Sequence, residues 1–109
     1  MAQFYIYRNT GLQQQSIPFV VVVQSSLYDQ YRRRVVVPLV LRSTLSGTDI
    51  LNSSRMNPLF TIDEIEVVLH PLEIVSVGLD QLGEKIGSLA EDGNRIADAL
   101  DELLTQAWK

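Results

Sequence analysis

The feature that most constrains the fold of this chain is a pair of β-branched runs, Val20 to Val23 and Val35 to Val37, joined by a polar segment. Runs of this kind without helical spacing are typical of buried strands, so we expect the two to be neighbours in one sheet. The joining segment, Gln24 to Arg34, is too long for a two-residue hairpin turn and is predicted to project as a loop. That loop is a candidate contact surface.

Shorter segments predict further strands around this pair. Phe4 to Tyr7 alternates bulky side chains in the manner of a strand, and Leu72 to Val77 is predicted to form another. Phe60 to Ile62 and Ile65 to Val68 flank the acidic pair Asp63-Glu64. We therefore expect a hairpin with the acidic pair in its turn.

Two interruptions predict where the sheet bends or ends. Pro38 has no backbone N–H for a ladder hydrogen bond, which places it at an edge or a bulge of its strand. Residues 42–57 are rich in Ser, Thr, Asn and Gly, which indicates an ordered loop or a short helix.

The C-terminal part of the chain has the clearest helical pattern. Ser88 and Glu91 have capping-box spacing, so a helix is predicted to start at Ser88. The apolar residues that follow at helical spacing fall on one face and are Ile96, Ala99, Leu100, Leu103, Leu104 and Ala107. We expect this face to be core or interface. Gly93, inside the pattern, is either a close-packing position or a weak point.

Length and charge limit the classes of function. The 109 residues fit one domain, residues 1–109, with a core of its own. The absence of cysteine excludes disulfides and fits a cytoplasmic location. No apolar run approaches the roughly 18 residues of a membrane span. The net charge of −4 argues against direct binding of nucleic acid, so a protein or peptide partner is expected.

The sequence offers no constellation for catalysis. His70 is the single histidine, which excludes a two-histidine metal site, and beside Pro71 it is expected to be a packed residue at a strand end. Ser25 and Ser26 have no nearby base to activate them and are expected to make loop hydrogen bonds. We therefore predict no catalytic residue, no metal and no cofactor. Binding is the favoured activity.

One basic cluster, Arg32-Arg33-Arg34, closes the polar segment. Neighbouring strand residues alternate faces, so at most two of the three guanidinium groups can act on one side of the sheet. Arg33 has two possible roles: it contacts a partner, or it forms a buried ion pair.

Several segments, in this order and spacing, resemble the CcdB toxin family: QFYIYRN, VVVQS with RRRVVVPL, NPLFTID, VVLHPLEIVSV, LGEKIGSL and NRIADALDELL. The resemblance covers nearly the whole chain. It implies a mainly β (α+β) fold, a small SH3-like antiparallel barrel with a C-terminal α-helix, assembled as a homodimer. Members of the family bind the dimerisation region of the DNA gyrase A subunit and poison the enzyme, and an antitoxin, CcdA, neutralises them by folding onto them. The resemblance thus implies a binding protein and not an enzyme.

Carried over by position, the family's gyrase-binding surface has two parts. The first is the loop after the Gln-Ser pair, which supplies Leu27 and Tyr28. The second is the end of the helix, which supplies Asp101, Leu104, Thr105, Ala107 and Trp108. An exposed tyrosine beside a leucine is a common interface anchor. The alternative is that Leu27 packs under the loop.

The chain departs from the family pattern at its C-terminus, where the usual glycine is absent and Trp108 lies beyond the usual aromatic position. Three hypotheses follow. The first is that the chain is a gyrase-poisoning toxin. The second is that it is a homologue that keeps the fold and binds an antitoxin but has lost gyrase poisoning. The third, an endoribonuclease toxin, requires a base in a basic groove, and the acidic charge and single histidine argue against it.

Overall fold

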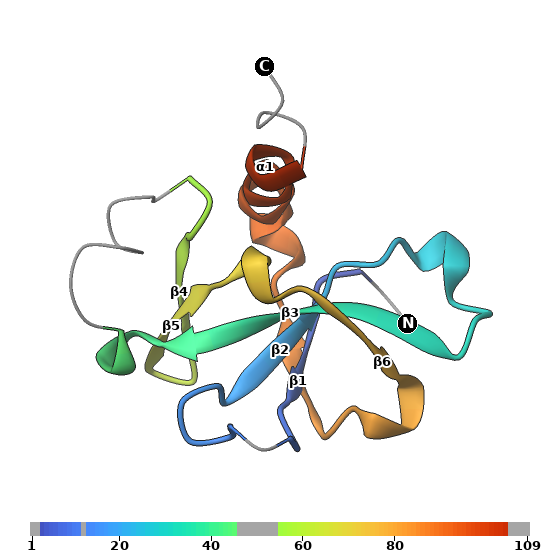
Figure 1. The fold of residues 1–109 in the computed structure, drawn as a ribbon, viewed down its shortest axis with the longest axis horizontal. Coiled ribbons are helices and arrows are strands. Elements are labelled where there is room, and N and C mark those ends of the chain that lie inside the picture. Colours follow the sequence, from blue (N-terminus) through green and yellow to red (C-terminus); the bar gives the residue numbers. More distant parts are fainter. Residues whose placement is uncertain (1–2, 12, 46–54, 105–109) are drawn as a thin grey trace.

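A curved antiparallel sheet with one C-terminal α-helix makes up the computed structural model, which describes residues 3–11, 13–45 and 55–104 (Figure 1). The elements are β1 (Tyr5–Arg8), β2 (Phe19–Val22), β3 (Arg33–Leu41), β4 (Leu59–Ile62), β5 (Ile65–Leu69), β6 (Val75–Gly78), β7 (Lys85–Ser88) and α1 (Gly93–Leu104). The strand order is β4-β5-β3-β2-β1-β7, and β6 also pairs with β3. The predicted fold class, mainly β with a C-terminal helix, is confirmed.

The two valine runs form the centre of the sheet, as predicted. Strands β2 and β3 pair in antiparallel register, with Val21 opposite Val37 and Phe19 opposite Leu39. All four of these side chains are at most 1% exposed. Consecutive β-branched residues are therefore buried here on both faces of a strand pair, because other elements cover each face.

Pro38 lies inside β3, so the prediction that it lies at an edge or a bulge of its strand is wrong. On one side Pro38 pairs with Val20 of β2. On the other side β3 changes partner, since β6 pairs as far as Val36 and β5 pairs from Leu39. The carbonyl of Pro38 accepts a hydrogen bond from the His70 N–H, so its nitrogen faces this change of partner. The missing N–H therefore falls between two partner strands.

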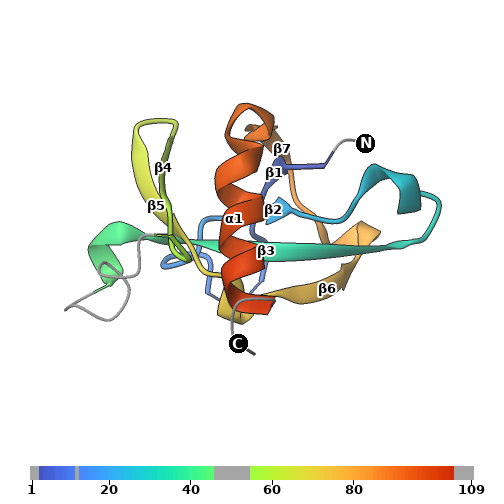
Figure 2. The same ribbon diagram turned by 90° about the horizontal axis from the view of Figure 1, so that it is seen from above.

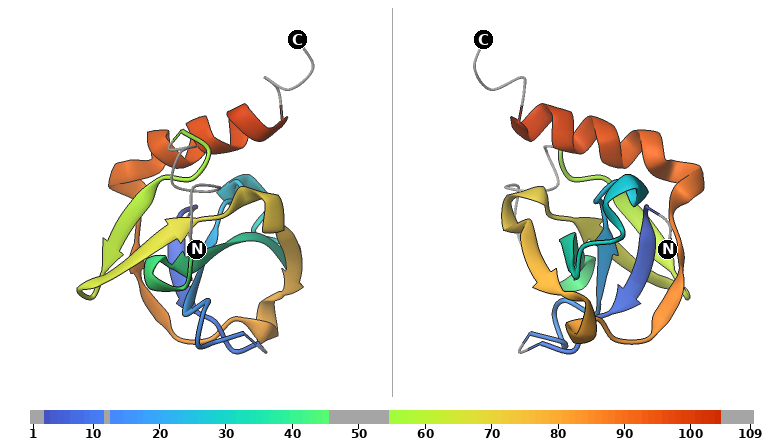
Figure 3. Two further views of the ribbon diagram at one scale, coloured as in Figure 1. Left: turned by 60° about the vertical axis from the view of Figure 1, so that its left-hand side comes forward. Right: turned by 90° about the vertical axis from the view of Figure 1, so that its right-hand side faces the viewer.

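The sheet curls into a half-barrel, and α1 lies across it (Figures 2 and 3). The main core lies between them and comprises Ile6, Phe19, Val21, Val37, Leu39, Phe60, Ile62, Val67, Leu69, Leu89, Ile96 and Ala99. Ile96 and Ala99 of α1 are fully buried, whereas Leu104 is 65% exposed. The predicted apolar face of the helix thus divides into a packed part and an exposed end.

The helix begins at Gly93, and the predicted start at Ser88 is wrong. Ser88 ends β7 and pairs with Tyr5 of β1, so tertiary pairing holds it in extended backbone. A 3₁₀ turn, Ala90–Asp92, then leads into α1. The Ser88 hydroxyl still accepts a hydrogen bond from the Ala90 N–H at 3.1 Å, so it caps the turn and not the helix.

The β4–β5 hairpin is as predicted, with the acidic pair in its turn. Ile62 pairs with Ile65, and Asp63 and Glu64 between them have φ values of 51° and 67°. Two successive residues with positive φ are typical of the type I′ turn that suits the twist of a hairpin. The segment 72–77 is a strand only in part, because a 3₁₀ turn, Pro71–Glu73, precedes β6. Of residues 42–57, Arg42–Thr44 form a 3₁₀ turn, while 46–54 lie outside the described residues.

Gly93 is a close-packing position. A Cβ atom there would lie 2.7 Å from Cε2 of Phe4, while nothing lies within 4 Å of a Cβ at Gly87. We expect Gly93→Ala to lower the free energy of unfolding by about 1 kcal/mol, because overpacking outweighs the gain in helix propensity. Urea denaturation measures this change. Gly87→Ala is the matched control and should be near neutral, and a Gly93→Ala variant more stable than the parent would contradict the close packing.

Candidate functional site: a clamped loop with exposed aromatic residues

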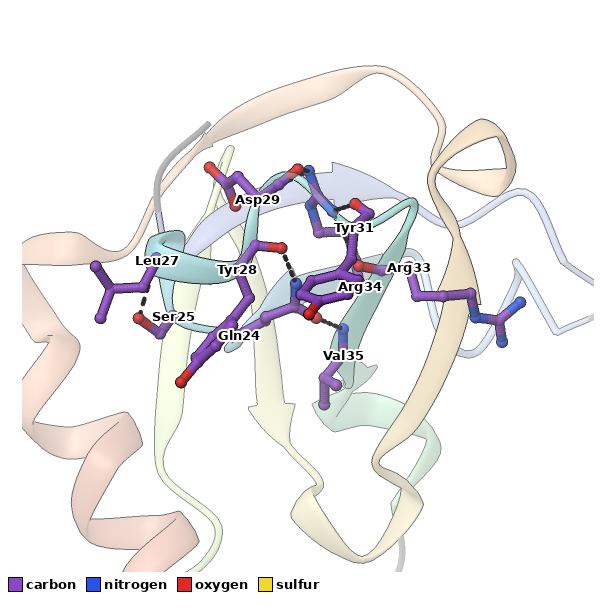
Figure 4. Close-up of polar contacts among 9 residues, drawn as sticks. All are labelled: Gln24, Ser25, Leu27, Tyr28, Asp29, Tyr31, Arg33, Arg34 and Val35. Carbon is purple, nitrogen blue, oxygen red and sulfur yellow. Dashed lines mark hydrogen bonds and ion pairs between the residues drawn. The ribbon is translucent and has the colours of Figure 1, made fainter.

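The loop that joins β2 to β3, residues 23–32, rises at one end of the sheet (Figures 1 and 4). A 3₁₀ turn, Ser26–Tyr28, forms its outer part. The Ser25 hydroxyl accepts a hydrogen bond from the Leu27 N–H at 3.2 Å and so caps that turn. This confirms the predicted role of Ser25 as a loop hydrogen-bonder.

A buried arginine, Arg34, holds the loop from below. Its side chain is 3% exposed, and its guanidinium donates to the carbonyls of Tyr31, Arg33 and Asp29, the last two at 2.9 Å. The Asp29 carboxylate lies 3.9 Å from Nη2. A buried cation is tolerated only with such partners. The buried arginine of the cluster is therefore Arg34, while Arg33 is exposed.

Gln24 ties the other end of the loop to β3. Its Oε1 accepts from the Val35 N–H at 3.0 Å, and its Nε2 donates to the Tyr28 carbonyl at 3.2 Å. Figure 4 shows both contacts beneath the turn. With Arg34 they fix the backbone on both sides of the outer residues. The loop is thus ordered by polar contacts of its own.

The clamped loop presents apolar side chains to solvent. Leu27 is 81% exposed, Tyr28 53% and Tyr31 58%. The alternative that Leu27 packs under the loop is therefore wrong. The rings of Tyr28 and Tyr31 lie with centroids 6.4 Å apart. Sequence reasoning missed Tyr31, although an aromatic residue three positions after Tyr28 in a polar loop was a usable signal.

The predicted helix residues are only partly described. Asp101 and Leu104 lie on the last turn of α1 and are exposed, and the helix rises on the same side of the sheet as the loop (Figure 3). Thr105, Ala107 and Trp108 lie outside the described residues. The structure therefore describes both loop residues of the predicted surface and two of its five helix residues, Asp101 and Leu104.

The described residues gather no group of three or more metal-ligating side chains. His70 is half-buried at the end of β5, and within the described chain its Nδ1 atom is buried without a hydrogen-bond partner.

Burial raises the pKa of the Tyr7 hydroxyl, and the neighbouring Tyr5 raises it further. Among the described helices, none is long and apolar enough to cross a membrane.

Comparisons with known proteins agree with this geometry. The sequence matches the family described as CcdB protein over residues 3–106. An endoribonuclease from a mycobacterial species, solved in complex with its cognate antitoxin, has a similar fold, with a TM-score of 0.74, 18% identity, and coverage of 100% of this chain and 99% of that chain. A second mycobacterial endoribonuclease gives a TM-score of 0.69 at 18% identity, covering 100% of this chain and 95% of that one. Curated proteins give no match.

Proposed function

Because this chain belongs to the CcdB family of toxins from toxin–antitoxin modules, we propose that it binds the dimerisation region of the DNA gyrase A subunit and poisons the enzyme. A CcdA-like antitoxin would neutralise it. The observation that carries the proposal is the clamped loop, which holds Leu27 and Tyr28 in solvent at the positions where the family resemblance expects gyrase contacts.

The physical chemistry of the loop supports an interface role. An exposed leucine beside an exposed tyrosine gains by burial against a partner, and such anchors dominate many interfaces. The contacts from Arg34 and Gln24 order the loop before binding, so little conformational entropy is lost when a partner binds. Asp101, Leu104, Thr105, Ala107 and Trp108 complete the proposed surface at the end of the helix.

A second exposed apolar segment supports a homodimer. Leu72 is 61% exposed, Ile74 37% and Val75 49%, in the turn before β6 and at its start. Exposed aliphatic side chains gathered in this way are typical of protein interfaces. A two-fold dimer would present the loop surface twice, as a two-fold symmetric gyrase target requires.

Expression in bacteria tests the proposal. We expect growth arrest in a host with ordinary gyrase and normal growth in a host whose gyrase is altered at the arginine that toxins of this family bind. Arrest in both hosts would contradict gyrase as the target. Growth in both would favour the alternative, a homologue that has lost gyrase poisoning but binds an antitoxin.

An endoribonuclease toxin is the second candidate, because the two similar solved structures named above are endoribonucleases. RNA cleavage needs a general base and a cationic groove. The single histidine has a buried Nδ1, and the net charge of the chain is −4. Cleavage of RNA by the purified protein would favour this candidate over gyrase binding.

A further inference from the structure

A small pocket opens beside the clamped loop, over the pairing of Val35 in β3 with Ser76 in β6. Its volume is about 320 Å³, and its lining is mostly apolar. The lining residues are Gln24, Tyr28, Tyr31, Arg33, Val35 and Ser76. This volume is near the lower bound of ligand pockets, roughly 300 Å³, so it suits one side chain of a partner better than a cofactor.

The walls of the pocket are held in place. Gln24 accepts from the Val35 N–H at the floor, and it donates to the carbonyl of Tyr28. Arg34 holds the carbonyl of Tyr31, whose ring lies against that of Tyr28. The pocket is therefore formed before any partner binds, which lowers the entropy lost on binding.

The edge of the pocket is cationic. The guanidinium of Arg33 donates to the hydroxyl of Ser76 at 3.1 Å and to its carbonyl at 2.8 Å. A guanidinium has five N–H donors, so these two bonds leave others for an anion. Arg32, the preceding residue, is also exposed, and the ion pairs of the described residues involve neither Arg32 nor Arg33. A carboxylate is the anion that a guanidinium binds best in a peptide.

We propose that this pocket binds an acidic peptide segment of the antitoxin, an inference that rests on the proposed function. An aliphatic side chain of the segment enters between Tyr28 and Tyr31 above Val35, and a neighbouring carboxylate binds Arg33. Contact with the apolar floor buries the aliphatic side chain, and the contact with Arg33 fixes the orientation of the segment. Since the chain as a whole carries a charge of −4, an acidic segment is attracted only near this edge, and binding should weaken as salt rises.

An NMR titration of the full chain with a synthetic peptide tests the pocket. The probe is a capped peptide in which glutamates flank one leucine, and the matched control peptide has lysines in their place. We expect the acidic peptide to shift the amide signals of Tyr31, Val35 and Ser76, and the lysine peptide to leave them unchanged. Arg33→Gln and Tyr31→Ala should each weaken binding at least tenfold, while both variants melt as the parent does.

Arg32→Gln is the matched control, because this exposed arginine does not line the pocket. It should weaken binding less than threefold. Equal losses of affinity in the Arg32 and Arg33 variants would show general electrostatic attraction in place of binding in the pocket. An absence of shifts at millimolar peptide would also overturn the proposal that the pocket binds the peptide. Growth arrest without pocket binding would overturn this inference alone. Pocket binding without gyrase-dependent arrest would overturn the proposed function instead.

Discussion

Replacing Arg34 with methionine is expected to lower the free energy of unfolding by about 3 kcal/mol, because the change removes a buried cation that binds three loop carbonyls and lies near a carboxylate. The carbonyls of Asp29 and Tyr31 would lose the guanidinium as a donor, and the Asp29 carboxylate would lose the Nη2 atom that lies 3.9 Å from it. Methionine fills a similar volume, so little of the loss comes from a cavity. Urea denaturation measures the change.

The matched control for this prediction is Arg32→Met. Arg32 belongs to the same cluster but is exposed, so its loss should change the free energy of unfolding by at most about 0.5 kcal/mol. The Arg34 variant should also bind gyrase more weakly, since the loop is no longer held. An Arg34→Met protein as stable as the parent would show that the clamp is dispensable.

Replacing Leu27 with aspartate is expected to weaken binding to the gyrase A subunit by at least about 100-fold, the effect of losing a central interface anchor. A carboxylate at this position would lose the apolar contact and would have to give up its hydration on binding. Because Leu27 is 81% exposed, the stability of the free protein should not change. Calorimetric titration with the dimerisation fragment of the A subunit measures the affinity.

Gln30→Ala provides the control on the same loop, since Gln30 is exposed and outside the proposed anchor pair. Its affinity should match that of the parent within about threefold. Tyr28→Ala should fall between the two variants, because Tyr28 is less exposed than Leu27, at 53%, and alanine introduces no charge. Parent-like affinity in the Leu27→Asp variant would remove the loop from the gyrase surface.

The strands that the sequence predicted best are those with consecutive β-branched residues, because burial on both faces leaves the strand as their only good conformation. The helix start was missed at Ser88, since its pairing with Tyr5 across the sheet overrides a local capping pattern. Pro38 was misplaced for a similar reason. A change of partner strand depends on the whole sheet and leaves no trace in the residues around Pro38.

The sequence proposed the position of the candidate site but not its detail. The loop and the two residues proposed as its anchors, Leu27 and Tyr28, came from the family resemblance, and the structure shows both side chains exposed. Which of the three consecutive arginines is buried depends on the register of β3, and the neighbouring valines do not reveal that register. The pocket formed by Tyr31 and Arg33 depends on contacts between the loop and β6, which only the fold brings together.

Direct binding between the purified protein and the dimerisation region of the gyrase A subunit tests the central proposal most closely. We predict saturable binding that the Leu27→Asp variant loses and the Gln30→Ala variant keeps, with no cleavage of RNA by the same preparation. No binding to gyrase by a folded protein, together with cleavage of RNA, would contradict it.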